Sequence, residues 1–389
     1  MRKHAGIARF ARIATLLSLS SCILVACGTP TTAPSPTNAS SALSGALHKL
    51  VAIPGGPPGA IAIVQSDSRL QVVTAGVGDL TARTAIAADD TLRIASVSKA
   101  FSGAVALSLV SQGKLSLADT IGMRLPSLPV AWQSVTVAQL LQHTSGVPDY
   151  IKSPEFIAAL QADPLQSLTP MQLLGYVAHE PLAFPAGSRY EYSDSDNIVV
   201  GLMVEAVTGG SYTTALDQSV SVPLHLAKTT LPDNVQLPDP YVRGYDVEVG
   251  KPTDDVSMVL NPALAWASGG MLSTPNELNT FMRGYVRGEL FSKATQTMQL
   301  QFVPGSSGPP GPGTNSAGLG IFRYQTSCGT VFGHTGNFPG YTLFAASSRD
   351  GTRSVVVAIN KQVNNTPVTS AFTQLRQAED IGVCAALGH

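Results

Sequence analysis

The sequence predicts an α+β fold, with one antiparallel sheet built from both chain ends and flanked by helices, and a mostly helical region inserted between them. Three observations favour this fold. Short β-rich runs lie near both ends of the 389-residue chain, helical apolar patterns fill its middle, and strands do not alternate with helices as they do around a parallel sheet. We see no internal repeat.

The N-terminal part predicts a helix followed by a hairpin. Residues 46–51 carry a helical apolar pattern, and residues 60–65 and 70–76 are short β-rich runs on either side of a polar turn. Such a pair predicts two neighbouring antiparallel strands of the sheet.

The middle of the chain predicts helices with recognisable ends. The apolar run 95–111 stops before Gly113, a typical residue just past a helix C-terminus. The helix predicted at 274–287 begins with a threonine cap followed by Pro275. Further helices are predicted at 136–143, 170–179 and 198–207.

The C-terminal part predicts the rest of the sheet. Residues 304–316, PGSSGPPGPGTNS, have the composition of an exposed loop. Four β-rich runs follow, and a helix is predicted at 366–377. The runs are 319–326, 330–333, 341–347 and 354–359.

The first residues predict export rather than structure. Four basic residues precede an apolar stretch at 13–25, which is shorter than the ~20 residues that span a bilayer. LVAC then ends at Cys27 and resembles a bacterial lipobox, so we expect residues 1–26 to be a signal peptide and Cys27 to carry lipid. The alternative is an ordinary signal peptide or a short anchor helix. Residues 27–44 are expected to be an extended Pro/Thr/Ser-rich tether, and 45–389 the folded domain in the bacterial cell envelope.

Charge and cysteine content narrow the classes of partner. Only 13% of residues are charged, and removal of residues 1–26 leaves 20 basic and 25 acidic residues, a formal charge of −5. No Lys/Arg run remains, which argues against nucleic acid. The sequence contains neither a CxxC nor an HExxH spacing, so a zinc site is not predicted. Cys328 and Cys384 are the remaining pair, and in an oxidising compartment we favour a disulfide over two buried thiols.

The stretch RIASVSKAF places one lysine in a small, apolar run. Ser96 and Lys99 are three residues apart, and on a helix they would share one face. A serine hydroxyl needs a base before it becomes a nucleophile, and an apolar site favours the neutral amine that could serve as this base. At a helix N-terminus, free N–H groups would also stabilise an oxyanion. The pair therefore predicts a nucleophile and its base.

The spacing alone is weak support. Ser111 and Lys114 repeat it, but a helix is predicted to end at Gly113, so that they would not share a helical face. Ser98 is adjacent to Lys99 and should point elsewhere. Without other motifs, the alternative for Lys99 is an ordinary lysine in a partly exposed first turn, with its stem on apolar surface and its ammonium in water.

Other motifs follow in order, and together they resemble the serine β-lactamase-like family of penicillin-recognising enzymes. Within that family the sequence is most similar to class C β-lactamases, D-alanyl-D-alanine carboxypeptidases and related esterases, over roughly residues 43–377. The resemblance implies the β-lactamase/transpeptidase-like fold. The motifs are LLQHTSGVPDY at 140–150, FPAGSRYEYSDSDNIVVGLMVEAVTG at 184–209, GGMLSTPNEL at 269–278 and GHTGNFPGY at 333–341.

The resemblance implies roles for individual residues. Ser96 matches the acylated nucleophile and Lys99 its base partner. Tyr192 matches the tyrosine that assists proton transfer, and a neighbouring Lys99 ammonium would lower the pKa of its phenol. His334-Thr335-Gly336 matches the strand that flanks the substrate. The Asn337 N–H would complete the oxyanion hole with that of Ser96.

Two residues depart from the family pattern. Asp194 stands where asparagine is usual, and a carboxylate beside Lys99 would form an ion pair, favour the ammonium and repel a substrate carboxylate. His334 stands where many members have lysine and is mostly neutral at pH 7, because the reference pKa of histidine is ~6.5. Both changes weaken attraction for anionic substrates, so weak β-lactamase activity at most is expected.

Other candidates near these motifs are given lesser roles. Ser195-Asp196-Asn197 spells a second family motif, but the flanking residues fit the register with Tyr192. His143 is interpreted as structural, and Trp266 and Tyr341 as residues that line the pocket.

The expected protein is an exported, lipid-anchored serine hydrolase that forms an acyl-enzyme on a small ester, peptide or peptidoglycan-like substrate. No metal or cofactor is implied. The alternative is a non-hydrolysing cell-surface lipoprotein that keeps the fold for binding, if Asp194 holds Lys99 as an ammonium. All the reacting groups are present, which favours the enzyme.

Overall fold

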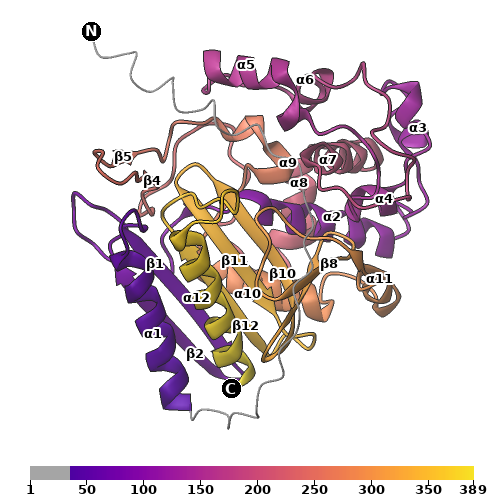
Figure 1. Ribbon diagram of the computed structural model, residues 1–389. Coiled ribbons are helices and arrows are strands. Elements are labelled where there is room, and N and C mark those ends of the chain that lie inside the picture. The colour runs from indigo at the N-terminus through magenta and orange to yellow at the C-terminus, as the bar shows by residue number, and fades with distance from the viewer. Residues whose placement is uncertain (1–35) are drawn as a thin grey trace, which may run out of the picture.

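A computed structural model describes residues 36–389, and its centre is one eight-stranded antiparallel sheet (Figure 1). The predicted α+β fold is confirmed, since β1 from the N-terminal part pairs with β12 from the C-terminal part, from Ala60↔Ile359 to Ser66↔Arg353. In spatial order the strands are β2 (Arg69–Gly76), β1 (Gly59–Ser66), β12 (Arg353–Ile359), β11 (Tyr341–Ser347), β10 (Gly329–Phe338), β9 (Phe322–Thr326), β8 (Thr314–Ala317) and β7 (Val303–Pro304).

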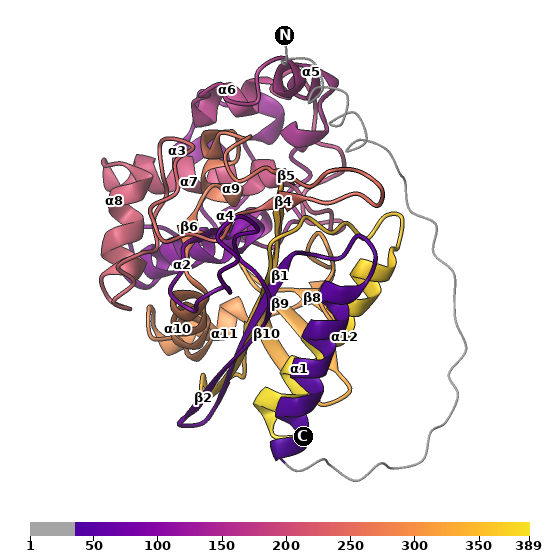
Figure 2. The ribbon, with the colours of Figure 1, turned by 90° about the vertical axis from the view of Figure 1, so that its left-hand side faces the viewer.

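Helices cover both faces of this sheet (Figure 2). The two terminal helices, α1 (Pro36–Ala52) and α12 (Ser370–Leu387), lie on one face, and α10 (Pro275–Arg287) with the inserted helical region lies on the other. Alternate residues of β1 accordingly belong to different cores: Ala60 packs with Leu43 on the α1 side, whereas Ile61 packs with Phe101 on the other side.

The inserted region is built from short helices around two longer ones, α2 (Ser98–Ser111) and α7 (Asp194–Thr208). The others are α3 (Ile121–Arg124), α4 (Val137–Leu141), α5 (Pro154–Ala162), α6 (Pro170–Gly175), α8 (Tyr212–Leu216), α9 (Trp266–Gly269) and α11 (Lys293–Gln299). Two small ladders complete the fold: β3 (Leu92–Arg93) pairs with β6 (Leu272–Ser273), and β4 (Tyr245–Asp246) with β5 (Asp254–Asp255).

The predicted tether does not extend to residue 44. Residues 36–44 belong to α1 instead of an extended segment, because Leu43, Leu47 and Leu50 recur at helical spacing and are buried. Their burial on the sheet and beside α12 outweighs a local composition typical of a linker. The predicted signal peptide and lipidated Cys27 lie outside the described residues.

The Gly/Pro-rich segment also differs from the prediction. Residues 304–316 do not form a simple exposed loop, since β7 and the start of β8 lie within them and Ser307 and Pro309 are buried. The connection packs inward because other elements hydrogen-bond to its backbone, which its composition does not reveal.

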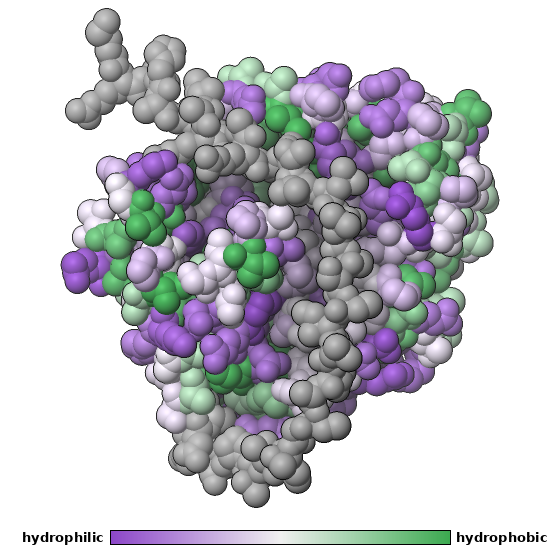
Figure 3. All heavy atoms as spheres, in the orientation of Figure 1, coloured by the Kyte–Doolittle hydropathy of each residue, from purple (hydrophilic) through white to green (hydrophobic). Residues whose placement is uncertain are grey.

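Among residues 36–389, no single helix combines the length and apolarity needed to cross a membrane. Two consecutive helical segments, Asp194–Thr208 and Tyr212–Ser221, reach those limits only when taken together, and they bend by 85° between them. On the face seen in Figure 3, apolar residues are scattered among polar ones.

Candidate active site

Ser96 lies in a tight turn at the start of α2. Residues Ala95–Val97 form one 3₁₀ turn, and α2 continues from Ser98. Ala95 has φ +50°, a conformation that residues other than glycine rarely adopt. The Ser98 hydroxyl donates to the Ala95 carbonyl at 2.7 Å and so stabilises the turn, while Ser96 keeps partial exposure. The turn therefore presents Ser96 and keeps Ser98 in a structural role.

Lys99 is buried beneath Ser96, with a side chain that is 1% exposed. Its ammonium contacts three acceptors: the Ser96 hydroxyl at 3.2 Å, an Asp194 carboxylate oxygen at 2.6 Å and the Ser268 carbonyl at 2.8 Å. A lysine ammonium has three protons to donate, so this set of contacts fits the charged form. The ion pair with Asp194 expected from the sequence is present.

Tyr192 lies beside this lysine, with the Lys99 Nζ 4.8 Å from its ring centroid. Burial, and next the Asp194 carboxylate, raise the pKa of the phenol well above its ordinary value. The Ser96 hydroxyl opposes this rise, although no well-formed hydrogen bond reaches the buried Tyr192 hydroxyl. The expected lowering of the Tyr192 pKa by Lys99 is therefore wrong, because burial and then the Asp194 charge raise this pKa.

Strand β10 forms the opposite wall. A Cβ at Gly336 would lie within contact distance of the Ile94 carbonyl oxygen and 3.2 Å from the Ala95 Cβ, so glycine lets the strand reach the Ser96 turn. His334 is buried, and burial lowers its pKa to about 3, so it is neutral. Its Nδ1 lies 2.6 Å from the Thr335 carbonyl oxygen. The strand thus presents no positive charge at position 334.

Asn337 lies on an unpaired stretch of this strand. β10 pairs with β11 as far as Phe338↔Tyr341, but its pairing with β9 ends at Gly333↔Phe322. Phe338 and Tyr341 close a two-residue hairpin, and hydrogen-bonded and non-hydrogen-bonded pairs alternate from there. The Asn337 N–H therefore points away from β11, along the edge at which the Ser96 turn packs.

The residues of the second motif, Ser195-Asp196-Asn197, bond to other parts of the fold. The Ser195 hydroxyl accepts from the Tyr150 N–H at 3.0 Å, and the Asn197 amide donates to Ser102 at 2.6 Å. Asp196 lies 2.8 Å from His143 Nδ1. None of these contacts involves Ser96 or Lys99.

The His143 ring packs against the Tyr192 ring. Its ring centroid is 4.6 Å from that of Tyr192, and its carbonyl accepts from the Glu191 N–H at 2.8 Å. Burial, and next the charge of Lys99, lower the pKa of His143 to about 3. This agrees with a structural histidine.

Two residues expected to line the pocket are instead part of the packing. The Tyr341 ring is buried, and its hydroxyl donates to the Val242 carbonyl at 2.8 Å. The Trp266 ring packs against Tyr212 at 5.1 Å and against Gly201 of α7. Motif position did not reveal that both rings are taken up by neighbouring elements. Cys328 and Cys384 form a disulfide that joins the β9–β10 turn to α12, with Cα atoms 5.2 Å apart.

Sequence reasoning missed Asp149, which lies behind Asp194. One Asp149 carboxylate oxygen accepts from the Asp194 N–H at 3.1 Å, at the first turn of α7. Burial, and then the Asp194 charge, raise the Asp149 pKa to about 7. Asp149 lies within the motif HTSGVPDY, but nothing in the sequence indicated its contact with α7.

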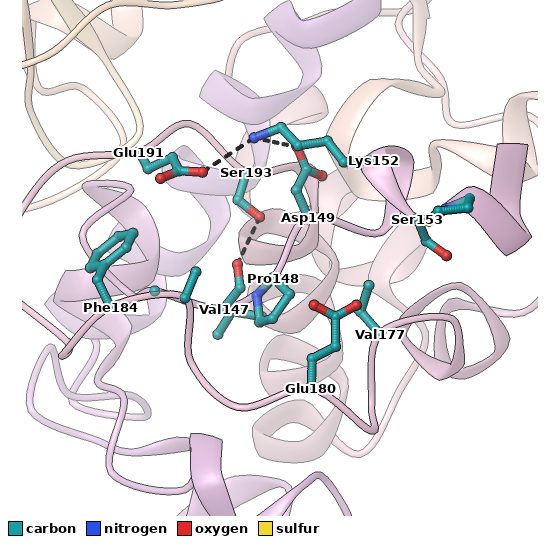
Figure 4. Close-up of a pocket in the computed structure, with 13 residues that line it drawn as sticks. Val147, Pro148, Asp149, Lys152, Ser153, Val177, Glu180, Phe184, Glu191 and Ser193 are labelled. Atoms are coloured by element: carbon teal, nitrogen blue, oxygen red, sulfur yellow. Dashed lines mark hydrogen bonds and ion pairs between the residues drawn. The ribbon is translucent and has the colours of Figure 1, made fainter. Parts of the chain in front are cut away.

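Asp149 also lines a pocket of about 290 Å³ (Figure 4). Lys152 lies across its rim, 3.7 Å from Asp149 and 3.4 Å from Glu191. The side chain of Glu180 points into the same space. Three carboxyl groups and one lysine thus line the region beside Asp194.

Comparisons with known proteins agree with this geometry. A family model described as Beta-lactamase matches residues 48–380. Penicillin-binding protein 4* of Bacillus subtilis is 23% identical over 303 residues, which cover 74% of this chain and 64% of that protein. Protein flp of Staphylococcus aureus is 29% identical over 163 residues, 41% of this chain and 32% of that protein. The chain therefore spans less than two thirds of the length of these curated relatives.

Solved structures match over more of their length. A D-stereospecific amidohydrolase from Streptomyces sp. has a TM-score of 0.75 and 30% identity, covering 87% of this chain and 98% of that one. The D-amino acid amidase of Ochrobactrum anthropi SV3, in complex with D-phenylalanine, has a TM-score of 0.79 and 21% identity, covering 90% and 98%. At that identity the second match shows the fold.

Proposed function

The chain belongs to the beta-lactamase family of serine hydrolases, and from this premise we propose that it hydrolyses an amide or ester bond of a small amino-acid-derived substrate through an acyl-enzyme on Ser96. The observation that carries the proposal is the position of Lys99, whose Nζ lies 3.2 Å from the Ser96 hydroxyl and 2.6 Å from Asp194. A nucleophile, a base and a residue that orients the base are thus within reach of one another.

The acylation step uses these groups in sequence. Lys99, once it has lost a proton through the partly exposed Asp194, accepts the proton of Ser96 while the serine oxygen bonds to the substrate carbonyl carbon. The carbonyl oxygen becomes an oxyanion held by the N–H groups of Ser96 and Asn337. The raised pKa of Tyr192 keeps its phenol protonated, so that this residue acts as a proton donor.

Collapse of the tetrahedral intermediate completes the step. The bond from the carbonyl carbon to the leaving nitrogen or oxygen breaks, the Tyr192 hydroxyl gives the leaving atom a proton, and the proton held by Lys99 replaces it. Water then attacks the acyl-enzyme with the same groups in the reverse roles, which releases a carboxylic acid and restores Ser96.

Charge around the site supports a substrate without a negative charge. His334 is neutral because its pKa is lowered to about 3, and the Asp194 side chain retains 13% exposure. Asp149, whose pKa is raised to about 7, and Glu191, which pairs with Lys152 and Arg189, add little net negative charge to that of Asp194. This environment favours an acyl part with a free ammonium over an anionic penicillin. The 30% identical D-stereospecific amidohydrolase supports a D-configured acyl residue.

Export and lipid anchoring remain part of the proposal. The signal-like residues 1–26 and Cys27 support a position on the outer side of the cytoplasmic membrane, and the disulfide between Cys328 and Cys384 supports an oxidising compartment. Growth in labelled palmitate, followed by mass analysis of the wild type and the Cys27→Ala variant, tests this part separately.

One observation favours the binding alternative. All three protons of the Lys99 ammonium have acceptors, so the resting state stabilises the form that cannot act as a base. A protein fixed in that state would bind a substrate without forming an acyl-enzyme.

Intact mass after incubation with a fluorophosphonate separates the two functions. We expect the reagent to add mass to the wild type and none to Ser96→Ala. A penicillin, tested in parallel, should add little mass because Lys99 is paired with Asp194 and His334 is neutral. If neither reagent modifies the folded wild type, the hydrolase proposal fails and the binding function replaces it.

A further inference from the structure

The connection between β7 and β8 lies against the candidate site. We call residues 305–313 the β7–β8 loop. β7 and β8 pair with the register Val303↔Ala317 and Pro304↔Ser316, so the loop is the end of a hairpin. Unlike a typical hairpin end, it is folded inward and has buried residues, Ser307 and Pro309 among them.

Four parts of the fold bond to this loop. Tyr190 donates to the Ser306 carbonyl at 2.5 Å, and Thr335 donates to the Pro309 carbonyl at 2.7 Å. Tyr324 of β9 lies 3.3 Å from the Ser307 hydroxyl, and Arg376 of α12 donates to the Pro310 carbonyl. Its glycines are packed as well, since a Cβ at Gly305 would lie 2.6 Å from the Tyr190 ring. The loop is therefore held in one position.

The bonded residues surround the proton donor of the proposed reaction. Tyr190 is two residues before Tyr192, and Thr335 is next to His334, whose ring centroid is 6.4 Å from that of Tyr192. The Thr335 side chain is fully buried, and its hydroxyl proton is already used by Pro309. The β7–β8 loop is thus bonded to residues that adjoin Tyr192 in the chain and to Thr335 of β10.

The leaving group must come close to Tyr192, because it takes its proton from the Tyr192 hydroxyl. Since the loop is bonded to Tyr190 and to Thr335 of the strand that flanks the substrate, we propose that the β7–β8 loop is a specificity-determining cover that admits only small, uncharged leaving groups. The substrates would then be primary amides and esters of small alcohols, which release ammonia or an alcohol. This inference rests on the proposed function and adds the identity of the leaving group to it.

Charge excludes the carboxylate of a leaving amino acid independently of size. His334 is neutral, and the cation that contacts the loop, Arg376, is paired with the buried Glu379. The Asp194 carboxylate beside Lys99 would repel a second carboxylate. Both the volume and the charge therefore disfavour removal of an amino acid from a peptide.

A series with one acyl group and several leaving groups tests the inference. D-Phenylalanine amide, its methyl ester, D-phenylalanyl-D-alanine and D-phenylalanyl-D-alanine amide are compared by kcat/KM. We expect the amide and methyl ester to exceed the charged dipeptide by at least 100-fold and the neutral dipeptide amide by at least 10-fold. Equal values for the amide and both dipeptides would overturn the proposal.

Trimming the loop provides the matched variant. Replacing residues 306–314 by Asn-Gly keeps the β7–β8 pairing and should form a two-residue hairpin. The ratio of amide to neutral dipeptide hydrolysis should fall at least 10-fold in this variant. Tyr190→Phe, a milder change that removes one hydrogen bond to the loop, should lower the ratio about 2- to 5-fold. A ratio unchanged in both variants would contradict the inference.

Fluorophosphonate labelling, which needs only a small leaving group, separates this inference from the proposed function. Labelling of Ser96 together with equal rates on amide and dipeptides would remove the inference and leave the hydrolase. Absence of labelling in the folded wild type would remove both. Melting temperatures of the two variants show whether each is folded before its ratio is interpreted.

Discussion

The two ends of helix α2 carry the same Ser-x-x-Lys spacing in opposite surroundings. At the N-terminal end, Lys99 is buried and contacts Ser96, Asp194 and Ser268. At the C-terminal end, Ser111 and Lys114 are exposed, and the Ser111 hydroxyl accepts from the Ser292 N–H at 2.9 Å. The first end forms a candidate active site, and the second caps the chain where it enters α11.

The difference comes from what packs against each end. α7, α9 and β10 converge on the first turn of α2 and exclude water from Lys99, which strengthens its electrostatic contacts. Past the other end, the chain leaves the helix at Gly113 with φ +71° and returns to solvent. A pair of residue types becomes reactive only where tertiary contacts desolvate and orient it.

The largest effect is expected from substitution of Lys99, and substitution of Lys114 serves as its control. Lys99→Ala removes the base and leaves Asp194 unpaired, and general-base catalysis contributes roughly 10²–10⁴-fold, so kcat on an activated ester should fall by about 10³. Lys114→Ala should retain full activity, since this side chain is exposed. Steady-state kinetics on the activated ester, with kcat compared between the two variants, tests this prediction. Equal loss in both would mean that the comparison between the helix ends is wrong.

Substitution of two glycines, one near each end of α2, tests the same comparison through the backbone. Gly336→Ala would push β10 away from the Ile94 carbonyl and displace the Asn337 N–H, and misplacement by ~1 Å costs roughly 10²-fold in rate. Gly113→Ala would strain a positive-φ position and cost about 1–2 kcal/mol of stability with normal kinetics. Paired measurements of kcat and melting temperature should therefore separate the two. A Gly336→Ala enzyme with normal kcat would contradict the role given to β10.

Asp194→Asn tests the ion pair at the buried end. The Asp194 charge helps to raise the Tyr192 pKa, so its removal should lower that pKa. We expect the falling limb of kcat/KM, which reflects loss of the Tyr192 proton, to move to lower pH, with about a 10-fold gain at pH 6 relative to pH 9. A pH–rate profile measures this. Loss of activity at every pH would show instead that Asp194 is required to position Lys99.

The smallest effect is expected at Ser111. Ser111→Ala removes the acceptor of the exposed Ser292 N–H, which water can replace, so unfolding should become easier by about 1 kcal/mol or less. Urea unfolding measures this change, and kinetics should be unaltered. If the free energy of unfolding fell by several kcal/mol, the contact of Ser111 with Ser292 would be important for the stability of the whole domain, which contradicts this comparison.

Much of the fold was predictable because its patterns are local. Six strands of the sheet, β1, β2 and β9 to β12, match short β-rich runs that the sequence identifies, and helix α10 has a threonine cap with proline next to it. Boundaries were less predictable. α7 begins at Asp194, four residues before the expected start, because its first turn is polar and Asp149 accepts the Asp194 N–H from a distant segment.

The candidate site was predictable in its residue types and not in its chemistry. Motif spacing identified Ser96, Lys99 and Tyr192, but the direction of the Tyr192 pKa was wrong because burial and Asp194 outweigh Lys99. The segment 304–316 was expected to be exposed from its composition, whereas bonds from Thr335 and Tyr190 hold it inward. Long-range contacts of this kind leave no local pattern.

The sequence by itself determined that strands lie near both chain ends with helices between them, the order of the motifs and the presence of a serine, a lysine and a tyrosine for hydrolysis. Only the tertiary structure decided which Ser-x-x-Lys pair is desolvated, which charge Asp194 balances and what covers the leaving-group side. The physical reason is that periodicity and capping act between near neighbours in the chain. Desolvation and electrostatic coupling depend on every group that packs within a few ångströms, and those groups come from segments about 100 to 240 residues apart, as the contacts of Lys99 with Asp194 and of β10 with the Ser96 turn show.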